Sequence, residues 1–117
     1  MQGEKIVEIV VDALEDLKAV DIKTIDVKDQ SNVTDYMIIA SGTSRRHVKA
    51  CAENVLMELK GKGLQPKGTE GSDAAEWVLV DIGDVVVHVM MPDTREYYDL
   101  EKLWQPLPGE EQQDSVQ

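Results

Sequence analysis

Apolar side chains recur every three to four positions across residues 4–19, and this spacing predicts an amphipathic helix. The polar side of that helix is a stripe of carboxylates, which is either a solvated surface or a face turned toward something basic. The apolar face carries Ile6, Val10, Ala13, Leu14 and Leu17, and the acidic stripe carries Glu4, Glu8, Asp12, Glu15 and Asp16.

A second helix is predicted to start after the polar break at residues 41–44 and to run to about Lys60. Gly61 and Gly63 end it. Cys51 is expected to be a small buried hydrophobe on its inner face. That face carries Val48, Cys51, Ala52, Val55, Leu56 and Leu59.

Two strands are predicted between these helices. Residues 22–27 have the mixed composition of an edge strand, and residues 28–34 form a loop. Residues 36–40 are apolar throughout, which is typical of an inner strand covered on both faces.

Residues 76–90 predict a β-hairpin with its turn at residues 81–84, where Gly83 can adopt a positive φ. Pairing Asp81 with Asp84 would place Leu79 opposite Val86 and Trp77 opposite His88. Side chains alternate between the two faces of a strand. One face is wholly aliphatic and belongs in a core: Val78, Val80, Val85, Val87 and Val89.

The other face of this hairpin is apolar in its middle and charged at the turn. A face of this kind is covered by another part of the chain or binds a partner. It carries Trp77, Leu79, Asp81, Asp84, Val86, His88 and Met90.

The remaining segments are connections and a C-terminal unit. Residues 64–75 link the second helix to the hairpin, and part of them can pair as a short strand. A short helix starting at Pro92 carries Tyr97 and Tyr98, and residues 100–104 form a final turn. Tyr98 and Trp104 are expected to pack this unit onto the sheet. Residues 105–117 are predicted to be a disordered acidic tail.

The element order predicts one α/β domain at residues 1–104, with a mixed β-sheet and flanking helices. The 117 residues suit a single core, and the single cysteine rules out an intrachain disulfide and a cysteine-based zinc site. No apolar run has the length of a membrane span, and no signal peptide is recognisable, so a cytoplasmic protein is expected.

The net charge of −11 argues against a general nucleic-acid binder. The charge is uneven, because residues 43–67 carry a net +4 and the rest of the chain carries −15. The acidic part suits a basic partner, although acidity also aids solubility alone.

Two places could carry chemistry. Ser44, Arg45 and Arg46 at the start of the second helix could contact a small anion or an RNA backbone, or could simply be a cap and surface arginines. Asp81, Asp84 and His88 resemble metal ligands, but His88 lies roughly 13 Å along the strand from Asp84, at ~3.3 Å per residue. No metal site and no catalytic site is therefore predicted.

Four segments in order resemble the ribosomal silencing factor family, also called RsfS or Iojap-like. They are DYMIIASGTSRRH at residues 35–47, EG at 70–71, WVLVDIGDVVVH at 77–88 and REYYDLEKLW at 95–104. The resemblance covers about residues 4–104. It implies a nucleotidyltransferase-like topology without enzymatic activity, and the chain lacks the Gly-Ser and Asp-x-Asp motif of those enzymes.

The resemblance further implies binding to the large ribosomal subunit through its protein uL14. The bound factor would sterically block joining of the small subunit and repress translation under nutrient limitation. No cofactor is expected, and a homodimer is a weaker expectation. The face carrying Trp77 is our predicted partner surface, with peripheral ribosomal RNA near Arg45 and Arg46. A nucleotide-binding enzyme and a dimeric scaffold remain the alternatives.

Overall fold

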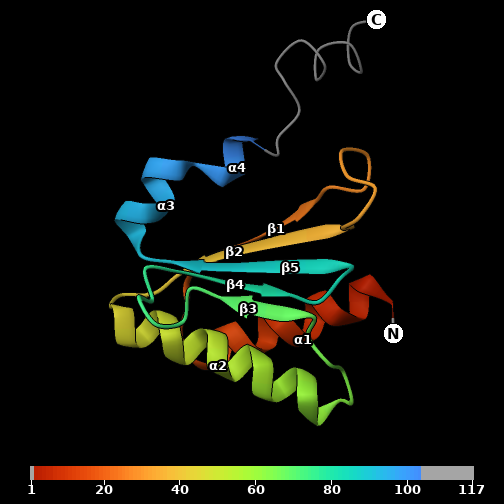
Figure 1. Ribbon diagram of the computed structural model, residues 1–117, viewed down its shortest axis with the longest axis horizontal. Coiled ribbons are helices and arrows are strands. Elements are labelled where there is room, and N and C mark those ends of the chain that lie inside the picture. Colours follow the sequence, from red (N-terminus) through yellow and green to blue (C-terminus); the bar gives the residue numbers. More distant parts are fainter. Residues whose placement is uncertain (1, 104–117) are drawn as a thin grey trace, which may run out of the picture.

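The computed structural model describes residues 2–103 as four helices and five strands (Figure 1). In chain order these are α1 (Gly3–Asp16), β1 (Val20–Asp26), β2 (Tyr36–Ser41), α2 (Arg45–Gly61), β3 (Gly68–Glu70), β4 (Trp77–Asp81), β5 (Val85–Met90), α3 (Pro92–Tyr98) and α4 (Leu100–Leu103).

The five strands form one mixed sheet in the order β1-β2-β5-β4-β3. The central pair, β2 and β5, is parallel, and the other three pairings are antiparallel. The predicted α/β domain with a mixed sheet is confirmed. Three further predictions are confirmed. The strand predicted at residues 22–27 lies at the edge of the sheet, and the strand predicted at residues 36–40 lies inside it. Residues 64–75 contain a short strand, as expected.

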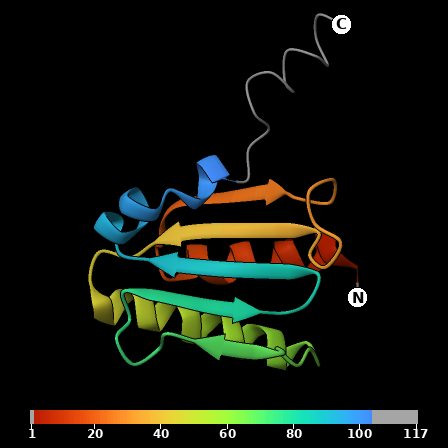
Figure 2. The same ribbon diagram turned by 45° about the horizontal axis from the view of Figure 1, so that its top comes forward.

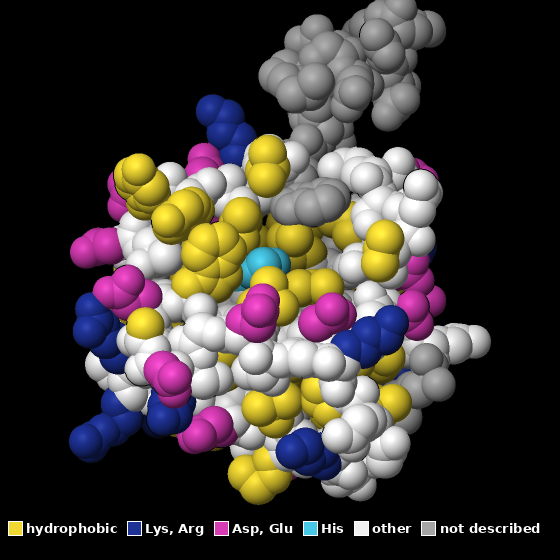
Figure 3. All heavy atoms as spheres, viewed as in Figure 1, with side chains coloured by type: hydrophobic (Ala, Val, Ile, Leu, Met, Phe, Trp, Pro, Cys, Tyr) yellow, Lys and Arg dark blue, Asp and Glu magenta, His cyan; other side chains and the backbone are white. Residues whose placement is uncertain are grey.

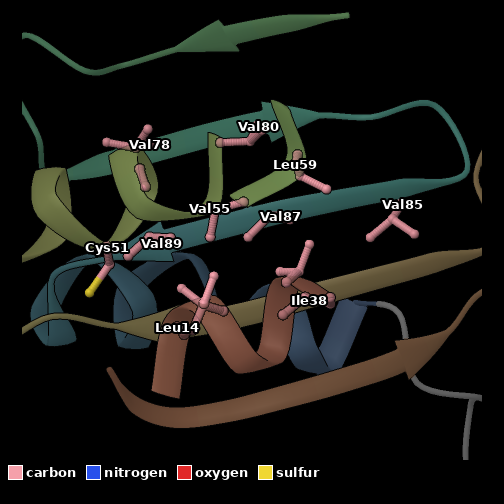
Figure 4. Close-up of a cluster of buried hydrophobic side chains, with 14 of the residues drawn as sticks. Leu14, Ile38, Cys51, Val55, Leu59, Val78, Val80, Val85, Val87 and Val89 are labelled. Carbon is pink, nitrogen blue, oxygen red and sulfur yellow. The ribbon is translucent and has the colours of Figure 1, made fainter. Parts of the chain in front are cut away.

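Helices α1 and α2 cover one face of the sheet and enclose the main core (Figures 1 and 4). The aliphatic face predicted for residues 78–89 points into this core, where all five of its valines are fully buried. Cys51 is buried as expected. The acidic stripe of α1 is exposed on the far side. The side chains that alternate onto one face of β4 and β5 therefore form part of the core.

Helix α1 ends at Asp16, earlier than the predicted position 19. The reason is local, because Lys18 adopts a left-handed conformation with φ 60° and the Ala19 amide donates to the Leu14 carbonyl. Helix α2 begins as predicted, since the Ser44 hydroxyl accepts a hydrogen bond from the His47 amide at 3.0 Å.

The predicted register of the hairpin is wrong by two residues. Asp81 pairs with Val86, Leu79 with His88 and Trp77 with Met90. The Ile82 amide bonds to the Val85 carbonyl, so that Gly83 and Asp84 form the turn. Gly83 has φ 92°, which a β-branched residue such as Ile82 avoids. A shift of two keeps every side chain on its predicted face.

Helices α3 and α4 lie over the other face of the sheet, near β1, β2 and β5 (Figure 2). They meet at Asp99, which is in the left-handed conformation. Leu100 packs against a small cluster of Val27, Met37, Ile39 and Met90. Trp104 and the predicted tail lie outside the described residues. Across residues 2–103, no helix is long and apolar enough to cross a membrane.

Candidate functional site: an aromatic surface on the open face of the sheet

The open face of β4 joins α3 to form a continuous aromatic surface. Trp77 lies 4.8 Å from Tyr98 between ring centroids, and Tyr98 lies 5.0 Å from Tyr97 in an edge-to-face arrangement. Leu79 is two residues from Trp77 on the same face and is half-buried. We call Trp77, Leu79, Tyr97 and Tyr98 the aromatic patch. Figure 3 shows hydrophobic side chains gathered on this face around a histidine, with acidic side chains beside them.

The patch is open to solvent although it is large and apolar. Tyr97 is 81% exposed and Tyr98 is 53% exposed, whereas Trp77 is half-buried between β4 and α3. Exposed aromatic side chains that adjoin one another are characteristic of protein–protein interfaces. The chain covers this face only in part, because Tyr98 lies against the Trp77 ring.

His88 supports the patch from below. The Trp77 indole N–H donates to His88 Nδ1 at 2.9 Å, so this ring nitrogen carries no proton. His88 is 5% exposed, and burial lowers its pKa from 6.5 to about 4. The imidazole is therefore neutral at physiological pH. Its role is to hold the Trp77 ring in place.

Two of the predicted partner-binding residues, His88 and Met90, are buried. Met90 is fully buried beneath the Trp77 ring and cannot reach a partner, which corrects its place in the predicted surface. Its burial follows from the side chains that cover this face, because Trp77 and Leu100 both pack against the cluster that contains Met90. Val86 is half-buried and, with His88 and Leu100, lines an apolar cavity of about 260 Å³.

The predicted acidic rim is present at the hairpin turn. Asp84 is exposed, and the half-buried Asp81 accepts a hydrogen bond from the Gly83 amide at 2.8 Å. Asp81 thus stabilises the turn in addition to providing charge. Among residues 2–103, no group of histidine, cysteine and acidic side chains is arranged to hold a metal ion.

The predicted anion contact at the start of α2 is largely satisfied within the protein. Arg45 forms an ion pair with Glu76, so a carboxylate of the protein compensates its charge. The Thr43 amide donates to His47 Nδ1 at 2.9 Å, and His47 Nε2 donates to the Leu17 carbonyl at 2.6 Å. Ser44 caps the helix and Arg46 is exposed. These bonds leave Arg46 as the cation most available to an anion.

Sequence reasoning placed Tyr97 and Tyr98 on a short helix but did not include them in the partner surface. The face on which a strand residue lies can be counted from the sequence, whereas the direction in which a following helix crosses the sheet cannot. The sequence feature that could have identified Tyr97 and Tyr98 is their adjacency in a short helix, because at least one of two adjacent residues must face away from the sheet.

Comparison with known proteins identifies relatives along nearly the whole chain. A family model described as ribosomal silencing factor during starvation matches residues 1–117. A ribosomal silencing factor from Chromobacterium violaceum is 47% identical over 104 residues, covering 89% of this chain and 85% of that protein. A mouse protein named for mitochondrial assembly of the ribosomal large subunit is 41% identical over 101 residues, covering 84% of this chain and 44% of that protein.

The fold has a close counterpart among solved structures. A crystal structure of a Chromobacterium violaceum protein, CV0518, superposes with a TM-score of 0.88 at 45% sequence identity, and covers 92% of both chains. The described fold is therefore similar to a crystallographically determined one over almost its full length.

Proposed function

Because this chain belongs to the ribosomal silencing factor family, we propose that it binds the large ribosomal subunit through its protein uL14 and sterically blocks joining of the small subunit. The consequence is repression of translation under nutrient limitation. The protein acts by occupying a surface and needs neither a catalytic group nor a cofactor. Its expected location is the cytoplasm, where the subunits meet.

The aromatic patch supports this proposal through its composition. Interfaces concentrate their binding energy in a few tryptophan, tyrosine and arginine side chains surrounded by a polar rim. Here Trp77 and Tyr98 adjoin at the centre, and Asp81 and Asp84 lie at the hairpin end of the same face. We assign the partner contact to this patch and rim, together with the accessible parts of Val86 and His88.

Charge supports the proposed partner. The chain carries −11 overall, and ribosomal proteins are typically basic, so opposite charges would accelerate encounter and disfavour wrong partners. Arg45 and Arg46 lie near the edge of this acidic body and provide the proposed peripheral contact with ribosomal RNA. Arg46 is the stronger candidate because Arg45 is paired with Glu76.

The first test is co-sedimentation of the protein with isolated large and small ribosomal subunits. Wild type should travel with the large subunit alone. Tyr97→Ala should weaken this binding, and its 81% exposure means that the fold loses little. The control is Met57→Ala, which removes a side chain that is 63% exposed on α2, on the other side of the sheet. The control should bind as wild type does.

A second variant, Trp77→Ala, tests the centre of the patch. It should weaken binding by more than ~2 kcal/mol, the range of interface anchors. Its unfolding must be measured alongside, because the substitution also leaves His88 Nδ1 without its donor. Sedimentation of wild type with neither subunit would contradict the proposed function. Equal loss of binding in Met57→Ala would contradict the assignment of the surface, and concentration-dependent self-association through the patch would favour a dimer at this face.

A further inference from the structure

The unit that carries Tyr97 and Tyr98 has no core of its own. No residue of α3 or α4 is fully buried, and the two helices are separated by the left-handed residue Asp99. A short helix without a buried face is only marginally stable in isolation. Its direction over the sheet must therefore be fixed by particular contacts to the rest of the domain.

Arg95 makes the most directional of these contacts. Its Nε donates to Glu101 Oε1 at 2.7 Å, and its Nη1 donates to the buried Ser41 hydroxyl at 2.9 Å. Glu101 Oε2 also lies 3.1 Å from Lys23 Nζ. One guanidinium thus joins α3 to α4 and to β2, and one carboxylate joins α4 to β1.

The pair of Arg95 and Glu101 differs from the other ion pairs within residues 2–103 by the burial of both its side chains. The Arg95 and Glu101 side chains are 11% and 17% exposed, whereas those of Lys5 and Glu8 are 68% and 67% exposed. Hydrogen bonds from Arg95 and Lys23 lower the pKa of the Glu101 carboxyl. A shielded, hydrogen-bonded pair of this kind fixes geometry far better than a surface pair does.

The position of Arg95 in α3 links the network to the aromatic patch. Arg95 and Tyr98 are three residues apart and so lie on neighbouring positions of one helical turn. Arg95 holds that turn to the β1–β2 side of the sheet, and Tyr98 meets Trp77 of β4. These two neighbouring anchors contact different strands, β2 and β4, and together define the rotation of α3 about its axis.

We propose that Arg95 and Glu101 are positioning residues that form a polar latch, and that this latch orients α3 so that Tyr98 packs against Trp77 and completes the partner surface. The binding consequence rests on the proposed function. The orientation of the tyrosine does not, because it concerns contacts within the chain. Neither residue needs to touch the partner.

The latch is tested by nuclear Overhauser contacts between the ring protons of Trp77 and Tyr98, measured in the full chain. Wild type should show these contacts. Arg95→Met keeps most of the side-chain volume, removes the guanidinium and should abolish them. Glu101→Leu removes the carboxylate of the same ion pair and should also abolish these ring contacts. Lys5→Met removes the exposed partner of Glu8 and should leave the contacts unchanged.

A second spectroscopic signal separates a local change from unfolding. The Trp77 indole proton, bonded to His88, should remain shifted downfield in both latch variants because β4 and β5 stay paired. Persistence of the ring contacts in both variants would overturn the proposal. Global unfolding of both would overturn it too, since the residues would then belong to the core framework.

Binding to large subunits is measured in parallel on the same proteins. Both latch variants should bind about tenfold more weakly, which corresponds to ~1.4 kcal/mol. Unchanged affinity after loss of the ring contacts would overturn the link between the latch and the partner surface. If wild type itself does not bind, the proposed function fails, and the ring contacts alone decide whether the latch orients α3.

Discussion

The burial of His88, which lowers the pKa of its imidazole, should make the protein sensitive to mild acid. In the folded state His88 accepts a proton only near its lowered pKa of about 4, whereas in the unfolded chain it titrates near 6.5. Between these values the unfolded state binds a proton that the folded state does not. The contribution of His88 to stability is thus complete above pH 6.5 and is lost as the pH falls toward 4.

The magnitude follows from the difference between the two pKa values. Each unit corresponds to ~1.4 kcal/mol, so the full loss is about 3 kcal/mol, and most of it has occurred by pH 4.5. His88 is almost fully buried, so solvent screens this effect little. A loss of this size is a large share of the stability of a small domain.

The assay is urea denaturation at pH 7 and pH 4.5, comparing wild type with His88→Gln. Glutamine does not titrate, and its amide oxygen can still accept from the Trp77 indole. Wild type should lose about 2–3 kcal/mol more than the variant between the two pH values. Equal losses in the two proteins would refute the reasoning. So would an imidazole signal of His88 that titrates near pH 6.5 in the folded protein.

Two further predictions concern backbone and thiol. Gly71→Ala should destabilise the domain by more than ~1 kcal/mol in urea denaturation, because its φ is +87° and an added Cβ would meet the Trp77 carbonyl oxygen at 2.0 Å. The control is Gly68→Ala, because nothing lies within 4 Å of a Cβ added there. An equal loss of stability in the control would contradict the steric argument. Cys51 is fully buried, and burial raises the pKa of its thiol. A disulfide reagent at pH 8 should therefore label Cys51 only after the protein unfolds. Rapid labelling of the folded protein would contradict this prediction.

The fold was largely accessible from the sequence because its elements follow simple periodicities. The five valines of residues 78–89 alternate strictly, so their burial did not depend on the register. The register itself was missed, because the segment from Asp81 to Asp84 admits more than one tight turn. The positive φ of Gly83 identifies the observed turn only if the glycine is known to occupy the first of the two turn positions.

The site was less accessible because it depends on how separate elements meet. The sequence placed Trp77 on the open face, and that placement holds. It could not show that Met90 lies beneath the Trp77 ring, or that Tyr98 lies against it, since both depend on the path of the chain after β5. The contact between Arg95 and Ser41 spans 54 residues and leaves no local pattern.

The position of β5 in the sheet determines the order in which the domain can assemble. It is the last strand within residues 2–103, yet it lies between β2 and β4, and in this part of the chain it alone links the β1–β2 and β3–β4 pairs. Until it inserts, the two hairpin-like halves share no strand pairing, and the valines of β5 are missing from the core. During synthesis the sheet therefore closes late, through contacts between distant parts of the chain. The strand that completes the fold is also the one that brings His88 beneath Trp77, so the aromatic patch cannot exist before the domain is whole.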